Sequence, residues 1–141
     1  MSATKSLANK ASKFDVIVRR SSAGLGLYAE EAIPKGARII EYTGPRITDD
    51  EVEKSRSRYL FAIADNKTIE GSGRDNIARY INHSCRPNCE PRIERGRVFI
   101  YAKRAIKPGE ELAYHYGKEY FETLIEPHGC RCVKCSEAKA A

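Results

Sequence analysis

The chain of 141 residues has no long hydrophobic run, no internal repeat and few cysteines. None of its apolar segments approaches the roughly 20 residues that a membrane-spanning helix needs, and no signal-peptide-like hydrophobic stretch follows the first residues. Three of its five cysteines fall within six residues, a spacing that suits one metal ion better than a disulfide framework. We therefore expect an intracellular protein that is neither membrane-embedded nor disulfide-rich.

Length and composition indicate one folded domain. The hydrophobic fraction of 41% excludes a disordered tail protein. The net charge is +6, and part of it lies in residues 1–13, which carry Lys5, Lys10 and Lys13 and no acid. We interpret this segment as a flexible basic leader that either attracts nucleic acid or chromatin or simply aids solubility. Three lysines are a weak nucleic-acid footprint, which favours the second reading.

Short strands separated by turns dominate the predicted secondary structure. Strands are expected at residues 14–19, 37–42, 59–64, 68–70, 91–94, 97–102 and 111–117. Thr48 and Glu51 form a capping box that begins a short helix, and Arg56 and Arg58 are expected at its C-terminal end, where they complement the helix dipole. A helical turn is predicted around residues 76–81. The expected fold class is mainly β with short helices.

A glycine-containing segment follows the first predicted strand. Gly24, Gly26 and Ala29 match the Gly-x-Gly-x-x-Ala fingerprint of dinucleotide-binding folds, which requires a helix to begin at the loop. Here Ile33-Pro34-Lys35-Gly36 follows after a few residues and cannot continue a helix. We therefore reject the dinucleotide interpretation. The residues alone then indicate a tight turn that needs glycine dihedral angles.

Three unusual strings follow one another in the rest of the chain. Residues 79–89 read Arg-Tyr-Ile-Asn-His-Ser-Cys-Arg-Pro-Asn-Cys, residues 109–117 read Gly-Glu-Glu-Leu-Ala-Tyr-His-Tyr-Gly, and residues 130–135 read Cys-Arg-Cys-Val-Lys-Cys. An isolated Asn-His pair is more often a loop cap than a ligand site, and an isolated tyrosine pair more often packs on a core. In this order, however, the strings resemble those of the SET-domain lysine methyltransferases, over about residues 14–135.

The resemblance implies a fold and a division of the chain. It implies several short curved β-sheets, with a knot-like crossing where the segment 109–117 lies beside the Asn-His loop. The SET domain would span residues 14–117, with an insert at 48–75. A zinc-binding post-SET segment would span residues 118–141.

The resemblance also implies a cofactor, S-adenosylmethionine, and the residues around it. The implied cofactor-binding residues are Gly24, Leu25, Gly26, Arg79, Tyr80, Asn82, His83 and Tyr116. The implied catalytic residues are Tyr116, Tyr42 and Tyr114, which line the lysine channel. His115 stands where the family usually has an acid. We expect this change to alter the surroundings of Tyr116 more than the chemistry.

Methyl transfer explains why such a channel is aromatic. The attacking lysine amine must be neutral, and because a free lysine has a pKa of about 10.4, neutralising it near pH 7 costs roughly 4–5 kcal/mol. A narrow apolar channel disfavours the ammonium by desolvation, and tyrosine rings hold the sulfonium by cation–π attraction. In the family, a tyrosine at the Tyr114 position restricts how many methyl groups are added. We therefore expect mainly monomethylation.

The cysteine cluster predicts one structural zinc ion. Cys130, Cys132 and Cys135 supply three thiolates, and the resemblance implies Cys85 as the fourth ligand. The last spacing is two residues, where the family usually has four. His128 or Cys89 could therefore substitute as a ligand, and the alternative to a zinc site is a set of cysteine thiols that bind no metal. We otherwise interpret Cys89 as a packing residue.

Two functions from different classes fit the sequence. The first is methyl transfer to a lysine of a histone or another basic protein, such as a ribosomal protein. The second is a catalytically silent SET-like module that binds chromatin or nucleic acid. Because Asn82, His83 and Tyr116 are all present, we favour the enzyme. The short insert predicts an open peptide groove, whereas a nuclear and a bacterial cytoplasmic setting both fit.

Overall fold

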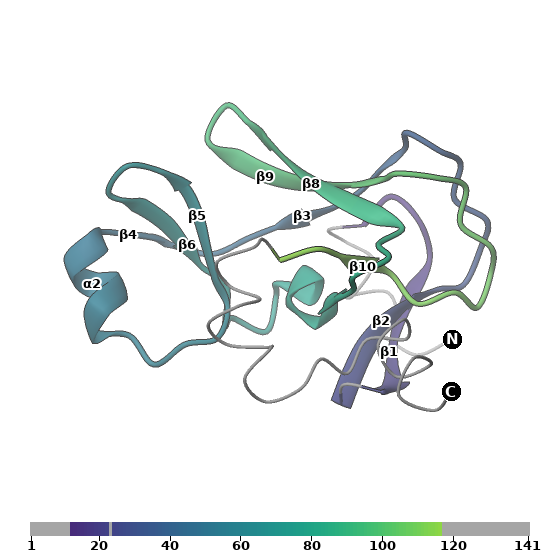
Figure 1. Cartoon of the computed structure of the whole chain (residues 1–141), viewed down its shortest axis with the longest axis horizontal. Coiled ribbons are helices and arrows are strands. Elements are labelled where there is room, and N and C mark those ends of the chain that lie inside the picture. Colours follow the sequence, from purple (N-terminus) through teal and green to yellow (C-terminus); the bar gives the residue numbers. More distant parts are fainter. Residues whose placement is uncertain (1–11, 23, 117–141) are drawn as a thin grey trace.

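The structure, a computed structural model, describes residues 12–22 and 24–116. These residues form four small β-sheets, one short α-helix and one 3-10 helix (Figure 1). The elements are β1 (Val16–Ser21), β2 (Gly24–Ala29), β3 (Arg38–Tyr42), β4 (Arg46–Ile47), α2 (Asp49–Lys54), β5 (Leu60–Ala64), β6 (Lys67–Glu70), η1 (Ile77–Tyr80), β7 (Asn82–His83), β8 (Cys89–Glu94), β9 (Arg97–Ala102) and β10 (Ala113–Tyr114). The prediction of a mainly β fold in several short sheets is confirmed.

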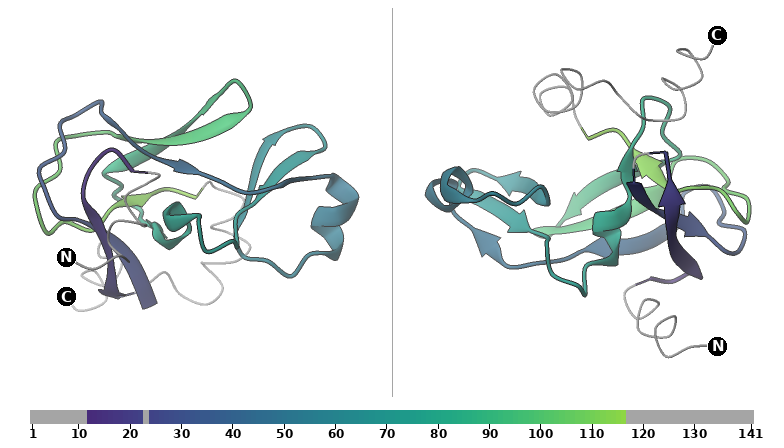
Figure 2. Two further views of the ribbon diagram at one scale, coloured as in Figure 1. Left: turned by 180° about the vertical axis from the view of Figure 1, so that it is seen from behind. Right: turned by 90° about the horizontal axis from the view of Figure 1, so that it is seen from below.

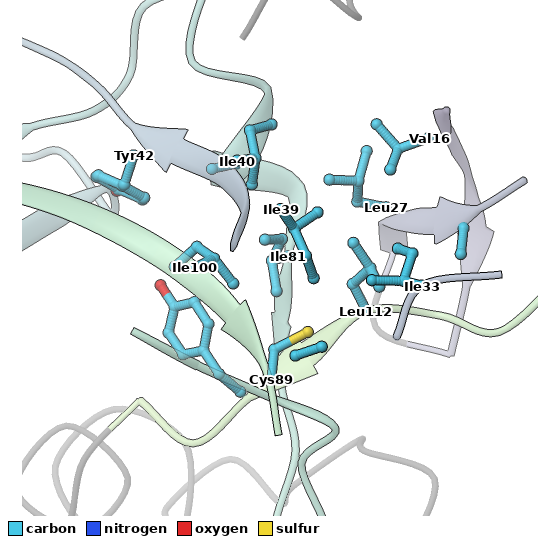
Figure 3. Close-up of a cluster of buried hydrophobic side chains, with 14 of the residues drawn as sticks. Val16, Leu27, Ile33, Ile39, Ile40, Tyr42, Ile81, Cys89, Ile100 and Leu112 are labelled. Atoms are coloured by element: carbon cyan, nitrogen blue, oxygen red, sulfur yellow. The ribbon is translucent and has the colours of Figure 1, made fainter. Parts of the chain in front are cut away.

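The central sheet has the order β3-β9-β8, and all three of its strands contribute residues to the core. The predicted β8–β9 hairpin is confirmed, and its turn residues Arg95 and Gly96 both have positive φ, as a type I′ turn requires. A bulge in β3 lets Ile39 and Ile40 both face the interior, where each is at most 1% exposed. Figure 3 shows the core side chains. Ile40 of β3, Ile100 of β9 and Ile81, just after η1, point toward Val16 and Leu27 of the β1–β2 hairpin.

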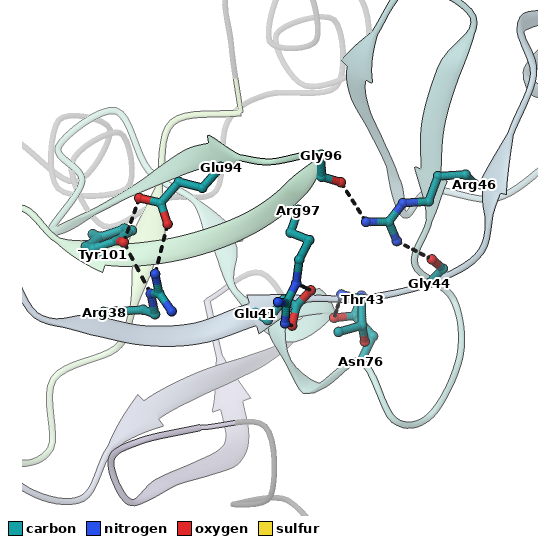
Figure 4. Close-up of polar contacts among 10 residues, drawn as sticks. All are labelled: Arg38, Glu41, Thr43, Gly44, Arg46, Asn76, Glu94, Gly96, Arg97 and Tyr101. Carbon is teal, nitrogen blue, oxygen red and sulfur yellow. Dashed lines mark hydrogen bonds and ion pairs between the residues drawn. The ribbon is translucent and has the colours of Figure 1, made fainter.

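Polar contacts cover the other face of this sheet. Arg38 donates to Glu94 and Tyr101, and Arg97 forms an ion pair with Glu41 (Figure 4). The guanidinium of Arg38 also lies 3.9 Å from the centre of the Phe99 ring. These arginines cover aromatic rings that would otherwise meet water, so the sheet is protected on both faces.

The insert at residues 48–75 forms a separate three-stranded sheet, β4-β6-β5, with α2 beside it. Figures 1 and 2 show this unit at one end of the molecule and the β1–β2 hairpin toward the other. The predicted capping box is present, because Thr48 and Glu51 exchange hydrogen bonds at the start of α2. Asn66, in the β5–β6 turn, accepts a hydrogen bond from the backbone of Asp49 and so anchors the helix.

The expected position of two arginines is wrong. The helix ends at Lys54, so Arg56 and Arg58 lie beyond its C-terminal turn. Ser55 adopts an extended conformation, and the hydroxyls of Ser55 and Ser57 accept hydrogen bonds from backbone groups two residues ahead. Serine hydroxyls that compete for backbone donors in this way end helices.

The glycine segment is a strand rather than a turn. β2 pairs antiparallel with β1 over its whole length, and only Gly24, at its start, has a left-handed φ, of 107°. β1 itself begins two residues later than predicted. Ser12 and Lys13, which we assigned to the basic leader, pair with β3 through Ile40 and Ile39. The rest of that leader and residues 118–141 lie outside the described residues.

The Asn-His and Gly-Glu-Glu segments lie side by side, as expected. β7 and β10 form a parallel pair, with Asn82 opposite Ala113 and His83 opposite Tyr114. Asn88 is 4% exposed, and its side-chain amide binds the Gly-Glu-Glu segment through both of its polar atoms. It donates to the Glu111 carbonyl and accepts from the Ala113 amide. The regular strand is shorter than predicted and ends at Tyr114. The expected knot-like crossing depends on the chain end, which lies outside the described residues.

None of the helices in the described part of the chain is long and apolar enough to cross a membrane.

Candidate functional site

A cavity of about 330 Å³ opens where β5, η1, β7 and β10 meet. This volume lies within the usual range of small-molecule sites. Seven of the residues predicted for cofactor binding or catalysis line it, namely Leu25, Tyr42, Arg79, Tyr80, Asn82, Tyr114 and Tyr116. Gly24, Gly26 and His83 do not belong to the lining.

Aromatic rings form one continuous wall of the cavity. The ring of Tyr42 lies 5.5 Å from that of Phe61, Phe61 lies 6.5 Å from Tyr114, and Tyr114 lies 5.0 Å from Tyr116, measured between ring centres. The hydroxyl of Tyr116 donates to the carbonyl of Ile81 at 2.5 Å. The three predicted catalytic tyrosines thus meet in one place, although they come from β3, from β10 and from the residues after β10.

A glycine and a buried asparagine hold Tyr42. Asn76 is 2% exposed, donates to the carbonyl of Gly71 and accepts from the backbone amide of Thr43. A Cβ atom on Gly71 would lie 2.5 Å from the Tyr42 ring. The close approach of backbone and ring therefore requires glycine at position 71.

The amide of Asn82 has a defined orientation. Its Nδ2 lies 2.8 Å from the carbonyl oxygen of Leu25, 2.9 Å from a carboxylate oxygen of Glu111 and 3.1 Å from the hydroxyl of Ser21. A carbonyl and a carboxylate can only accept, so this atom must be the nitrogen. Among the described residues, the Oδ1 atom of Asn82 has no hydrogen-bond partner, and it is the acceptor that this residue offers to a ligand.

The imidazole of His83 is not part of the cavity lining and links two segments. Its Nδ1 accepts from the backbone amide of Tyr116 at 3.1 Å, so the proton of the neutral ring lies on Nε2, which contacts the sulfur of Cys85 at 3.4 Å. The pKa of His83 is lowered to about 4, because burial disfavours the charged form and His115 adds repulsion. His83 is therefore a neutral link between β7 and the Tyr116 segment.

The charged residues of the cavity lining are two arginines, Arg58 and Arg79. Arg79 donates to the carbonyl of Ser72 and to the hydroxyl of Tyr80, and its guanidinium lies over the rings of Tyr59 and Tyr80. Its Nε atom is buried without a hydrogen-bond partner among the described residues. A buried donor in this state is a place where a ligand acceptor binds favourably.

The glycine segment contributes one side chain and one close contact. Leu25 lines the cavity, is 53% exposed and gives a ligand an apolar surface. Gly26 is buried, and the side chain of Glu111 occupies the space where a Cβ atom would lie. Gly24 supplies the left-handed turn before the strand.

The predicted zinc ligands are only partly within the described residues. Cys85 is a partly exposed thiol beside His83, whereas Cys130, Cys132 and Cys135, together with the alternative ligand His128, lie outside the described range. Within the described range, no three potential metal ligands gather. Cys89 is 1% exposed in the core, and burial raises its pKa to about 12, which agrees with a packing role.

Sequence reasoning missed part of the lining, namely Arg58, Tyr59, Leu60, Phe61 and Ile81. Residues 59–64 were correctly predicted as a strand, and alternate positions on a strand share a face. The aromatic residues Tyr59 and Phe61 at such positions were the available signal. Which sheet this strand would join was not readable from that signal.

A sequence profile of the SET domain matches residues 24–117. The chain belongs to the SET-domain family. The matched region of the SET domain contains all the described residues of the cavity lining, from Leu25 to Tyr116. The cysteine cluster at residues 130–135 lies beyond it.

Several curated relatives are similar in sequence to this chain. The H3 lysine-4-specific histone-lysine N-methyltransferase of Chaetomium globosum is 43% identical over 104 residues, which cover 64% of this chain and 10% of the relative. Histone-lysine N-methyltransferase trr of Drosophila melanogaster is 38% identical over 83% of this chain and 5% of its own length. The Saccharomyces cerevisiae H3 lysine-4-specific enzyme is 36% identical over 88% of this chain and 13% of its own length. The chain thus spans a small part of the relatives that it matches.

Proposed function

We propose that this SET domain transfers a methyl group from S-adenosylmethionine to the ε-amine of a protein lysine. The observation that carries the proposal is the wall of Tyr42, Phe61, Tyr114 and Tyr116 beside the defined acceptor of Asn82. The names of the relatives, which are histone-lysine N-methyltransferases, support it and favour a histone tail as substrate. A histone substrate would mean that the chain acts on chromatin in the nucleus.

The residues present fit this methyl donor. Oδ1 of Asn82 is an acceptor for its ammonium group, the exposed side chain of Leu25 offers an apolar surface to its adenine, and the unpartnered Nε of Arg79 is a donor for one of its oxygens or nitrogens. When bound, S-adenosylmethionine supplies an electrophilic methyl group on a sulfonium. Gly24 and Gly26 then support the site through the backbone, and His83 supports it through the hydrogen bond between its ring and the Tyr116 amide.

The chain itself contributes a channel that is lined by aromatic rings and by the positive charges of Arg58 and Arg79. Desolvation among aromatic rings disfavours the ammonium form of a lysine, and the two arginines add repulsion toward that form. Both effects favour the neutral amine, which is the attacking species. The rings also fix the direction from which the amine approaches, and such positioning supplies much of the rate acceleration in transfer reactions.

We assign Tyr116 an accepting role rather than a basic one. Its hydroxyl proton is donated to the carbonyl of Ile81, and a neutral phenol is a poor base. The oxygen of Tyr116 instead suits weak C–H···O contacts with a polarised methyl group.

We further propose that the main product is monomethyl-lysine. Tyr114 is 6% exposed, lines the cavity, and has its ring between those of Phe61 and Tyr116 in the aromatic wall. A hydroxyl there can hold a water molecule in the space that a second or third methyl group would need.

A structural zinc ion at Cys85, Cys130, Cys132 and Cys135 is part of the proposal. Cys85 fits this role because its thiol is partly exposed and lies next to β7, at the base of the Asn-His segment. The donor Nε2–H of His83 is directed at the sulfur, as an outer partner of a thiolate ligand would be.

Transfer of labelled methyl groups to a panel of histones and to a whole-cell extract tests the function. Tyr116→Phe should lower transfer by at least about tenfold, since it removes a group beside the reacting atoms. Tyr101→Phe is the matched control, because its hydroxyl is also hydrogen bonded but lies on the far face of the central sheet. A folded native protein that binds histones or nucleic acid without any transfer would instead establish the silent binding module.

A further inference from the structure

Glu111 lies at the junction of the glycine strand and the Asn-His strand. The backbone of residues 109–112 is bonded to β2, since Gly109 donates to the carbonyl of Ala29 and Leu112 donates to that of Leu27. The next two residues, Ala113 and Tyr114, pair with β7 instead. The side chain of Glu111 therefore stands where the chain passes from one strand to the other.

One carboxylate oxygen of Glu111 contacts both strands. It accepts from Nδ2 of Asn82 at 2.9 Å, and it occupies the space that a Cβ atom on Gly26 would fill. Burial of Tyr28 raises its pKa most, and the charge of the Glu111 carboxylate raises it further, so this carboxylate also acts on β2. Gly26 is thus small because the carboxylate packs on it, and the amide of Asn82 is oriented partly by that carboxylate.

We propose that Glu111 is a positioning residue for the ligand ammonium group. It fixes the amide of Asn82 with Nδ2 turned toward the protein and Oδ1 toward the cavity, and it places a negative charge directly behind that amide. A charged acceptor on the nitrogen polarises the amide, which makes Oδ1 a stronger acceptor for a cation. This role rests on the proposed methyl-donor site, and it adds an acid behind a cavity whose charged lining residues are arginines.

The first experiment needs no ligand. In the nitrogen-15 NMR spectrum of the full chain, the side-chain amide of Asn82 is assigned by its loss in Asn82→Asp. In the native protein its protons should be shifted downfield and exchange slowly. Glu111→Gln and Glu111→Ala should move this signal and accelerate exchange by roughly tenfold, because one charged acceptor is weakened or lost.

The matched control is Glu110→Gln, which removes the same charge one residue earlier. Glu110 pairs with Arg104 at the surface, so this variant should leave the Asn82 amide signal in place. Gly26→Ala disturbs the same contact from the other side and should reproduce the shift seen for Glu111→Ala. An Asn82 amide that is unchanged in both Glu111 variants would overturn the positioning role, whatever the ligand proves to be.

The second experiment measures affinity by calorimetry for S-adenosylhomocysteine and for its analogue without the amino group. Glu111→Gln should weaken binding of the first by roughly tenfold, through loss of a nearby charge, and leave binding of the second unchanged within about twofold. Equal losses for both ligands would mean that Glu111 only maintains the fold, and would refute the inference. If the native protein binds neither ligand, the proposed function fails, and the NMR result still decides the role of Glu111.

Discussion

Replacing Gly71 by alanine should displace the Tyr42 ring and so damage both the fold and the cavity. Gly71 is buried and has no left-handed φ, so the backbone itself tolerates alanine. The added Cβ would lie 2.5 Å from Cε1 of Tyr42, 2.6 Å from its Cζ and 2.5 Å from Nδ2 of Asn76, the residue that bonds Gly71 and Thr43 beside that ring. Carbon atoms pack favourably at about 3.5–4.0 Å, so the ring must move by roughly 1 Å.

The expected cost follows from that displacement. Overpacking of a filled interior costs about 1–3 kcal/mol of unfolding free energy. For a domain of this size each kcal/mol lowers the melting temperature by roughly 3–5 °C. Because Tyr42 lines the cavity, a shift of about 1 Å should also lower kcat/KM for methyl transfer by up to roughly a hundredfold.

Gly73→Ala is the matched control. A Cβ at Gly73 would meet nothing within 4 Å, and this residue also has no left-handed φ. Alanine there should be neutral or should stabilise the protein by about 0.4–1 kcal/mol, through the unfolded state. Thermal unfolding followed by circular dichroism and steady-state transfer kinetics measure the two effects separately.

Two results would contradict this reasoning. Equal melting temperatures for the Gly71 and Gly73 variants would mean that the Tyr42 ring has room to spare. A destabilised Gly71→Ala protein with native kcat/KM would mean that the position of Tyr42 does not limit the reaction.

Three further predictions concern other parts of the chain. Asn88→Ala should lower the free energy of unfolding in urea by about 2–4 kcal/mol, because it leaves the carbonyl of Glu111 and the amide of Ala113 without their side-chain partner, and a loss below about 1 kcal/mol would contradict that role. Tyr114→Phe should shift the products toward di- and trimethyl-lysine, and an unchanged product mass spectrum would show that the hydroxyl is not the limit. Elemental analysis should find about one zinc ion per chain, and less in Cys85→Ser, whereas an active protein free of metal would refute the zinc site.

Features that depend on neighbouring residues were predictable from the sequence. The capping box of Thr48 and Glu51 needs only residues three apart, and the Arg95-Gly96 turn needs only its two flanking strands. The end of α2 was not foreseen, although its cause is also local. Hydroxyls of Ser55 and Ser57 capture backbone donors, and this competition is invisible to a reading based on charge and helix dipole.

Features that depend on pairing between distant strands were predictable only through the family resemblance. The place of Phe61 in the aromatic wall requires knowing that β5 faces β10, and no periodicity within residues 59–64 contains that information. The contact of Glu111 with Asn82 and Gly26 likewise joins three segments that are distant in sequence, and the local sequence of none of them indicates the contact. The role of Gly26 toward a cofactor stays a prediction, and the contact that its small size permits with the Glu111 carboxylate was not foreseen.

The parallel pair of β7 and β10 has a consequence for how the protein reaches its native state. A parallel pair of two residues is too short to persist by itself, and the pairing of Asn82 with Ala113 closes a loop that contains the whole β8–β9 hairpin. Such distant contacts form slowly, so the pair should appear only after the hairpins have docked. The amide protons of Ser84 and Asn88, which are bonded to the β10 strand, should therefore exchange with solvent before those of β9, and the site should open well below the temperature at which the central sheet melts.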